Sequence, residues 1–358
     1  MKYLNFLLPA ATIAAFFSGC EKTGNPSAPD MSNGIYVVNE GTFMTNNGSI
    51  TYFNPETGEI VNGVFETANN RPLGDVVQSF SVVGDTCGYI VVNGSAKLEI
   101  VSLKDFKSNT PPIAVAYPRF FLQTRSEKGY LSSGSMQGTI YVVNLLSRTI
   151  EDSITVGYGP EGMLMRNSKV IVANSGGWGV DSTLSIIDVE TDAVSATLQV
   201  GKVPIDMVYD SDGYLWVYCK GYATYSWDPP YNLVSETDAI LQKINSETNE
   251  IVWQQPVGKA GDYTASPPRI AISDDGHTVY YLRPDGLYSL NAAMPVQGAM
   301  FVPGSFYGMD VNPNNGDVYV FEASFTGNGT MKIYSNGGTP VLSGVVGIAP
   351  SGAVFHLE

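Results

Sequence analysis

Short runs of alternating apolar and polar residues, separated by clusters of turn residues, repeat along most of the chain. The clearest copy runs from Ser182 to Cys219. It contains four such runs: Thr183–Asp188, Ala193–Val200, Ile205–Tyr209 and Tyr214–Cys219. Gly, Pro, Asn and Asp interrupt the pattern after roughly eight to ten residues, which leaves no room for a helical period. The pattern therefore predicts short antiparallel strands joined by tight turns.

The same unit recurs at a spacing of about forty residues, which is typical of the blades of a β-propeller. Strands that resemble Tyr214–Cys219 begin near Gly88, Gly129, Lys169, Thr278, Asp317 and Ala353. Strands that resemble Thr183–Asp188 begin near Ser49, Lys97, Thr139, Ala239, Gly286 and Thr330. Stacked blades bury sheet faces that one blade cannot bury alone. We predict an all-β protein, a seven-bladed β-propeller of four-stranded antiparallel blades, with eight blades as the alternative.

Both ends of the chain supply strands that need a place in this ring. Ile35–Asn39 resembles the second strand of a blade, and Gly347–Leu357 resembles the first and second strands of another. Combining strands from the two ends in one blade would close the ring and remove its exposed edges. One of the two second-strand candidates is then surplus, and the pattern leaves both open.

The N-terminus has the features of an export signal. Lys2 precedes an apolar stretch, Leu4–Phe17, that is too short to span a membrane. Phe17-Ser18-Gly19-Cys20 resembles a bacterial lipobox, and the polar residues that follow have the composition of a flexible linker. We predict a signal peptide at residues 1–19, a tether at 20–33 with a lipidated Cys20, and a propeller at 34–358. The alternative is an ordinary signal peptide with an incidental cysteine.

The net charge of the chain excludes some classes of binding partner. The 358 residues include 34 Asp and Glu against 19 Lys and Arg, and loss of Lys2 with the signal lowers the net charge from −15 to −16. Such a surface repels nucleic acid and gains nothing from anionic lipid, so membrane attachment must come from the lipid anchor. Cys87, expected in a turn, and Cys219, expected at a strand end, lie about three blades apart and are not expected to form a disulfide.

The connections fall into two classes, which a propeller would place on opposite faces. Connections after first and third strands are short and repetitive, as at Asn54, Asp188 and Asp210. They have ordinary turn chemistry and lack the spacing of a calcium loop, so no metal site is predicted. We name the face that carries them the turn face. The opposite face, the loop face, carries the connections after second and fourth strands, which are longer and irregular.

The loop face concentrates aromatic rings, guanidinium groups and amides. Its longest connections include Glu40–Asn47, Ser175–Asp181, Lys220–Tyr231 and Gly258–Arg269. Rings with polar tips and fixed donors suit a large, flat ligand rich in amide or hydroxyl groups. The alternative is that these aromatics only pack their own loops. The candidate ligand-binding residues are Phe43, Asn46, Arg71, Arg119, Trp178, Tyr222, Tyr225, Trp227, Tyr231, Tyr263, Arg269 and Tyr307.

The residues that most enzymes use are scarce. The two histidines, His277 and His356, are expected in a turn of the turn face and in the last strand, away from any nucleophile motif. Gly157–Gly162 matches G-x-G-x-x-G by letter but precedes a strand, outside the βαβ unit that dinucleotide binding requires. We predict a protein that is not an enzyme, with no catalytic residues, no metal and no cofactor.

The stretch Gly34–Ile60, GIYVVNEGTFMTNNGSITYFNPETGEI, resembles the opening of a family of Bacteroidota surface lipoproteins with YncE-like propellers. The ending VVGIAPSGAVFHL is similar to the last strands of that family. Its best-understood members, the BtuG proteins, bind vitamin B12 and related corrinoids and pass them to BtuB, a TonB-dependent outer-membrane transporter.

The resemblance implies a lipoprotein of the outer membrane, exposed on the cell surface, that captures cobalamin as a transported ligand. It implies a BtuB-like transporter as the partner. The aromatic candidates would then contact the corrin ring, and Asn46, Arg71, Arg119 and Arg269 would bind its amide arms. Two other hypotheses remain. One is a glycan-binding or adhesion propeller of the surface layer, since stacked aromatics also suit sugars. The other is a metal-dependent lactonase or lyase, which requires acidic or amide side chains in the axial channel.

Overall fold

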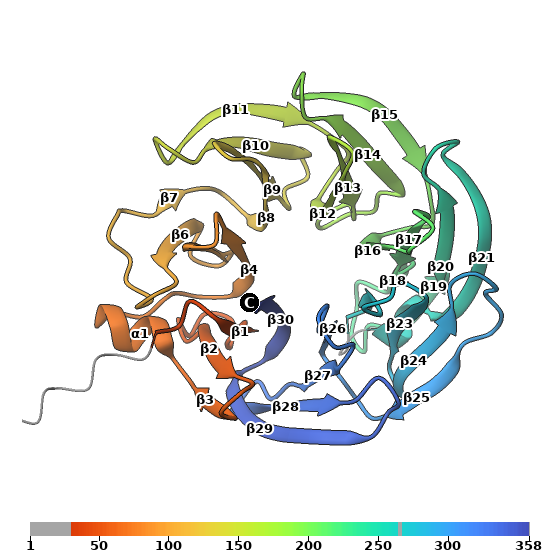
Figure 1. Ribbon diagram of the computed structural model, residues 1–358. Coiled ribbons are helices and arrows are strands. Elements are labelled where there is room, and N and C mark those ends of the chain that lie inside the picture. The colour runs from red at the N-terminus through yellow and green to blue at the C-terminus, as the bar shows by residue number, and fades with distance from the viewer. Residues whose placement is uncertain (1–29, 264–266, 358) are drawn as a thin grey trace, which may run out of the picture.

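Seven four-stranded antiparallel sheets form a closed ring around a central axis (Figure 1). The computed structural model describes residues 30–263 and 267–357. Within each blade the first strand lies nearest the axis and the fourth lies at the rim. The prediction of a seven-bladed propeller is therefore confirmed. The predicted signal peptide, Cys20 and most of the tether lie outside the described residues.

Six blades are built from consecutive stretches of the chain. The second contains β4 (Val77–Val83), β5 (Cys87–Val92), β6 (Lys97–Ser102) and β7 (Ile113–Ala114). The third contains β8 (Pro118–Arg125), β9 (Lys128–Ser133), β10 (Thr139–Asn144) and β11 (Thr149–Thr155). The fourth contains β12 (Pro160–Arg166), β13 (Lys169–Asn174), β14 (Thr183–Asp188) and β15 (Ala193–Gln199). These bounds follow the expected strands within one or two residues, except that Cys87 begins β5 instead of lying in a turn.

The remaining three of these blades follow the same order. The fifth contains β16 (Pro204–Tyr209), β17 (Leu215–Cys219), β20 (Asp238–Asn245) and β21 (Glu250–Lys259), with a hairpin of β18 (Ala223–Tyr225) and β19 (Leu233–Glu236) inserted after β17. The sixth contains β22 (Ile270–Ile272), β23 (Thr278–Arg283), β24 (Gly286–Asn291) and β25 (Ala299–Pro303). The seventh contains β26 (Gly308–Val311), β27 (Val318–Glu322), β28 (Asn328–Tyr334) and β29 (Pro340–Ile348). A 3-10 turn, η1 (Ala260–Tyr263), follows β21.

The first blade joins the two ends of the chain. It contains β30 (Pro350–His356), β1 (Gly34–Asn39), β2 (Ser49–Asn54) and β3 (Glu59–Val61), and β30 pairs with β1. The expectation that the chain ends in a first and a second strand was wrong. Residues up to Ile348 complete β29, the chain turns at Ala349 in a left-handed conformation, and the second-strand place is already filled by β1.

Second strands are buried on both faces, which explains why they are almost wholly apolar. In β17, Leu215 and Val217 pack toward the fourth blade, and Trp216 and Tyr218 pack toward the sixth. The buried residues form seven clusters, one at each junction between neighbouring blades of the described ring. Because burial of one large apolar side chain contributes about 1.5–3 kcal/mol, the blade junctions supply most of the stability.

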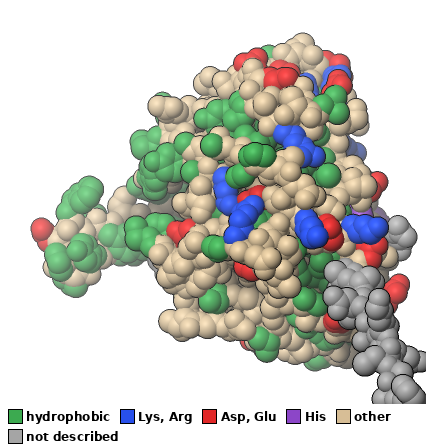
Figure 2. All heavy atoms as spheres, turned by 90° about the vertical axis from the view of Figure 1, so that its left-hand side faces the viewer, with side chains coloured by type: hydrophobic (Ala, Val, Ile, Leu, Met, Phe, Trp, Pro, Cys, Tyr) green, Lys and Arg blue, Asp and Glu red, His purple; other side chains and the backbone are tan. Residues whose placement is uncertain are grey.

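The two faces of the disc differ as expected. On the turn face, His356 Nδ1 lies 2.5 Å from the carbonyl oxygen of Ser32, which places the start of the described chain there. The β18–β19 hairpin projects from the opposite, loop face and forms the lobe at the left of Figure 2. One short helix, α1 (Val64–Asn69), follows β3 and was not expected from the pattern. No helix in residues 30–263 and 267–357 is long and apolar enough to cross a membrane.

Removal of residues 350–358 should open the ring. The variant loses β30, leaves the β1 edge unpaired and exposes the cores on both sides of the first blade, so we expect aggregation and a melting temperature lower by roughly 10 °C or more. Thermal unfolding and size-exclusion chromatography would measure this. A matched variant with residues 226–232 shortened to an Asn-Gly turn should melt close to the parent, because the hairpin tip lies outside the core. A monomeric, equally stable truncated chain would contradict the closure mechanism.

Candidate functional site

All of the largely exposed aromatic side chains in the described residues lie in connections of the loop face. They come from the first, third, fourth, fifth and seventh blades and from the connections between blades. The eight are Phe43, Tyr117, Tyr158, Trp178, Tyr225, Trp227, Tyr231 and Phe325. The turn face and the rim expose only aliphatic residues and methionines among their large apolar side chains. Rings concentrated on one face indicate an interaction surface.

The β18–β19 hairpin holds one of these rings well above the disc. Trp227, at its tip, is 96% exposed. Backbone hydrogen bonds order the tip, from Ser226 to Asn232 (2.8 Å), and the base, from Thr237 to Tyr222 (3.0 Å). The amide of Gly261 also donates to the Glu236 carboxylate at 3.0 Å, which ties the hairpin to the connection that follows β21. The hairpin is therefore an ordered projection of the loop face, held by hydrogen bonds at its tip and at its base.

A second pair of rings marks the connections of the third and fourth blades. Trp178 packs edge-on against Tyr117, with ring centroids 5.1 Å apart. The loop that carries Trp178 crosses close to the preceding connection, since a Cβ on Gly159 would meet the Gly177 nitrogen at 1.8 Å. Gly159 also has a φ of 57°. The G-x-G-x-x-G letters thus reflect close backbone packing, in agreement with the strand that follows them.

Charged and polar side chains lie near the starts of the first strands, where the chain enters each blade from the loop face. Arg119 Nε donates to Glu161 at 2.8 Å, and its guanidinium also donates to Gln78. Burial acts to lower the pKa of Arg119, but the charge and hydrogen bond of Glu161 outweigh it and raise the pKa. Nearby, Tyr307 donates to Glu40 at 2.8 Å, and burial together with this carboxylate raises the pKa of the phenol.

Two further carboxylates and an arginine line a cavity of about 190 Å³ in the channel. Burial raises the pKa of Asp310 to about 7, against the opposing effect of the Ala353 amide, which donates to it at 2.7 Å. Asp206 adds to the rise at Asp310, and its own pKa is raised by burial. Arg269 lowers the pKa of both carboxyls, yet no ion pair within 4.0 Å joins it to a carboxylate in the described residues.

The structure separates the predicted site residues into groups. Phe43, Asn46, Trp178, Tyr225, Trp227 and Tyr231 are exposed on the loop face, and Tyr222 is half-buried at the hairpin base. Arg269 lines the channel cavity, and Arg119 is bound to Glu161 beside it. Tyr307 donates to Glu40, and its ring packs edge-on against the exposed Phe325, with ring centroids 5.4 Å apart. Tyr263 does not present its ring to the face. It is 1% exposed, and its hydroxyl bonds to that of Tyr218 at 2.8 Å inside a blade junction.

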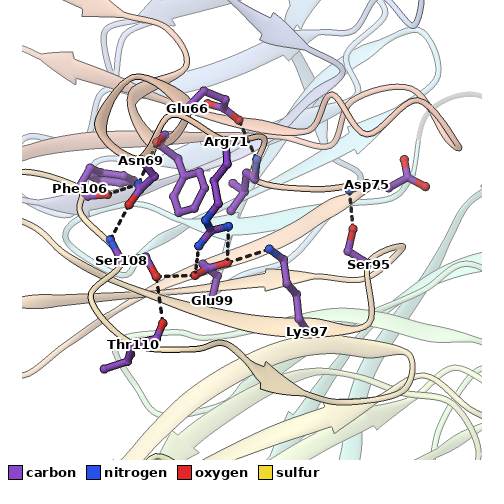
Figure 3. A network of polar contacts seen from close by, with 12 residues as sticks. Glu66, Asn69, Arg71, Asp75, Ser95, Lys97, Glu99, Phe106, Ser108 and Thr110 are labelled. Atoms are coloured by element: carbon purple, nitrogen blue, oxygen red, sulfur yellow. Dashed lines mark hydrogen bonds and ion pairs between the residues drawn. The ribbon is translucent and has the colours of Figure 1, made fainter.

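Arg71 belongs to a structural network between the first and second blades (Figure 3). Its guanidinium donates two hydrogen bonds to Glu99, at 2.7 and 3.1 Å, and lies over the Phe65 ring. The buried Glu99 also accepts from Lys97 at 2.7 Å and Ser108 at 2.5 Å. Burial acts to raise the pKa of Glu99, but these hydrogen bonds outweigh it and lower the pKa. Two of the five N–H donors of Arg71 are thus engaged by Glu99.

The sequence interpretation missed the channel residues. Gln78, Glu161, Asp206 and Asp310 each lie near the start of a first strand, as Arg119 and Arg269 do. Polar residues at matching places of successive repeats were the available signal, because the first strand of every blade faces the axis. No group of three or more His, Cys, Asp or Glu that could hold a metal occurs in the described ranges. His277 lies in a turn of the turn face, as predicted.

Comparison with known proteins identifies the family and the fold. The family model described as a domain of unknown function (DUF5074) matches residues 33–343. A quinonprotein alcohol dehydrogenase-like protein from Bacteroides thetaiotaomicron VPI-5482 is similar in structure, with a TM-score of 0.65, 17% identity, and coverage of 91% of this chain and 79% of that one. Hydrazine synthase from Kuenenia stuttgartiensis is similar with a TM-score of 0.60, 15% identity, and coverage of 92% and 99%. No curated protein matches in sequence. At these identities the similar structures show the propeller fold alone.

Replacement of Glu99 by Ala should destabilise the propeller by about 1.5–3 kcal/mol, because Arg71, Lys97 and Ser108 lose the acceptor that they share. Urea unfolding would measure the loss. The folded pKa of Glu99 is lowered, so its contribution to stability is present above the unfolded pKa and disappears as the pH falls through the folded one. The exposed Glu59, replaced by Ala, is the control and should change little. Equal stability of the two variants at pH 7 would refute the role of the network.

Replacement of Asp310 by Asn should stabilise the fold at pH 8, by about 1 kcal/mol or more. The folded pKa of Asp310, about 7, lies above its unfolded value, so wild-type stability falls as the pH rises from about 4 to 7. The Asp310→Asn variant lacks that contribution to the decline, and its amide oxygen can still accept from the Ala353 amide. Melting temperatures between pH 5 and pH 8 would show it. A variant that loses stability with pH as steeply as the wild type would place the titration elsewhere.

Proposed function

The chain belongs to the DUF5074 family, and on that premise we propose that its loop face binds a corrinoid such as cobalamin for delivery to a TonB-dependent outer-membrane transporter. The observation that carries the proposal is the restriction of the exposed aromatic rings in the described residues to this one face. The resemblance of Gly34–Ile60 to the opening of corrinoid-binding surface lipoproteins supplies the ligand class.

The chemistry of the face supports a large, flat ligand with amide arms. Phe43, Trp178 and Trp227 offer apolar rings that are 67%, 73% and 96% exposed. Such rings can bury much of a macrocycle at low cost in side-chain entropy. Asn46 adds an amide on the same loop as Phe43, and the channel adds the donors of Arg269 and the acceptors of Asp206 and Asp310.

The proposed anchor is compatible with this use of the loop face. We propose that lipidated Cys20 holds the protein on the outer membrane and exposes it at the cell surface. The described chain begins at the turn face, where Ser32 lies beside His356. An attachment on that side leaves the ring-bearing loops free to meet a ligand and a transporter.

A glycan-binding propeller is the second candidate, and the same exposed rings favour it, since aromatic side chains also stack on sugars. The lactonase or lyase hypothesis asks for acidic side chains in the channel. Asp206 and Asp310 do line it, but the described residues contain no group of three or more candidate ligands that could hold a metal. The proposed protein is a binding protein, without a catalytic step.

Isothermal titration of residues 30–358 with cyanocobalamin tests the proposal. We expect saturable binding at one site, weakened about fivefold or more by Trp178→Ala or Trp227→Ala, since each loss of an anchoring ring costs at least ~1 kcal/mol. Met294→Ala, which removes a side chain 75% exposed on the turn face, is the matched control and should bind like the wild type. Absence of heat and of any thermal shift would refute corrinoid binding, and a hit on a glycan array would then select the second candidate.

A further inference from the structure

The axial cavity is lined by three charged side chains, Asp206, Arg269 and Asp310, and each of the two carboxylates accepts from a backbone amide of a neighbouring blade. It is formed by first strands of several blades, among them β4, β26 and β30, which surround the centre of Figure 1. Its volume is about 190 Å³. A space of this size excludes a macrocycle and admits a short arm of a few heavy atoms.

Hydrogen-bonding capacity remains open inside this cavity. Asp206 accepts from the Met207 amide at 2.9 Å and from the Ile270 amide at 3.2 Å, one bond to each carboxylate oxygen. Asp310 Oδ2 accepts from Ala353, whereas Oδ1 has no hydrogen-bond donor in the described part of the chain. Arg269 likewise has no hydrogen-bond acceptor among the described residues, although a guanidinium carries five N–H donors.

The charges select the kind of group that fits. A free cation would be attracted by Asp206 and Asp310 but repelled by Arg269, and a free anion would be attracted by Arg269 but repelled by the two carboxylates. A neutral group that carries both a donor and an acceptor meets neither penalty and can satisfy both sides at once. Among short arms, a primary carboxamide has this combination, with two N–H donors beside one carbonyl oxygen.

We propose that the axial cavity binds a primary carboxamide arm of the ligand, with Arg269 donating to its carbonyl oxygen and Asp310 Oδ1 accepting from its N–H group. The inference rests on the proposed function, which supplies the ligand that carries the arm, because a corrinoid presents such amides around its ring. The rings of the loop face would then hold the macrocycle, and the cavity would set its orientation on the face.

The test uses the full chain with three small probes: propionamide, propionate and propylammonium. Each is titrated at pH 7.5 while NMR follows the arginine Nε–H resonances, which Arg269→Met assigns by the loss of one signal. We expect propionamide to shift the Arg269 resonance saturably and the two ions to shift it at least tenfold more weakly. Arg125→Met, which removes an arginine paired with Glu190 on the turn face, is the control and should leave propionamide binding intact.

The same variants are then titrated with cyanocobalamin. Arg269→Met and Asp310→Leu should each weaken binding about tenfold or more with native circular dichroism, and Arg269→Lys covers the case in which the methionine variant fails to fold. Tighter binding of either ion, or an Arg269 resonance indifferent to propionamide, would overturn the inference even where cyanocobalamin binds. Propionamide binding without any cyanocobalamin binding would overturn the proposed function and leave the cavity assignment standing.

Discussion

No second strand of this ring has a face that can meet water. Residues of β1 alternate between two cores, with Ile35 and Val37 packed toward the seventh blade and Tyr36 and Val38 toward the second. Each blade therefore depends on both neighbours, and the stability of the ring depends on the one junction that sequence order cannot supply, the pairing of β1 with β30. The loops and the channel keep their geometry because that junction is closed.

A scaffold held by its blade junctions leaves its two faces and its axis available for other uses. The turn face is built from short connections in which Asn and Asp side chains accept from nearby backbone amides, as Asn54 and Asn245 do. The loop face carries longer segments, and the rings there are largely exposed. The axis takes the polar residues of the first strands. Aromatic contact and polar orientation are thus supplied by different parts of each repeat.

The sequence was sufficient to predict the repeat and the strands. Alternation and turn residues located β14 and β17 within a residue, because period-2 burial and tight turns are local properties. It was insufficient wherever a residue's role depends on a distant partner. Tyr263 is buried because it packs against Tyr218, which is 45 residues away in the sequence. Arg71 is held in place because it donates to Glu99, which lies on the next blade. A residue's assignment to a long connection says nothing about which way that connection folds.

The positions of the residues at the channel could not be predicted from the sequence either, because they depend on partners in other blades. Arg119 and Arg269 were assigned to the loop face because they follow long connections, yet they lie at the inner strands, where the geometry of a closed ring turns them toward the channel. Their acidic neighbours, Glu161, Asp206 and Asp310, come from three other blades. Only the ring brings them together, so a single repeat contains no sign of the cluster.

The place of β30 in the first blade also sets the order in which the molecule can be completed. Its residues are synthesised after those of every other described strand, and they occupy the innermost position of the blade that contains the first described strand. Blades two to seven can assemble as their residues emerge, but the first blade is incomplete until β30 has emerged. A growing polypeptide therefore remains an open arc until β30 has been made, and the ring closes only when β30 pairs with β1.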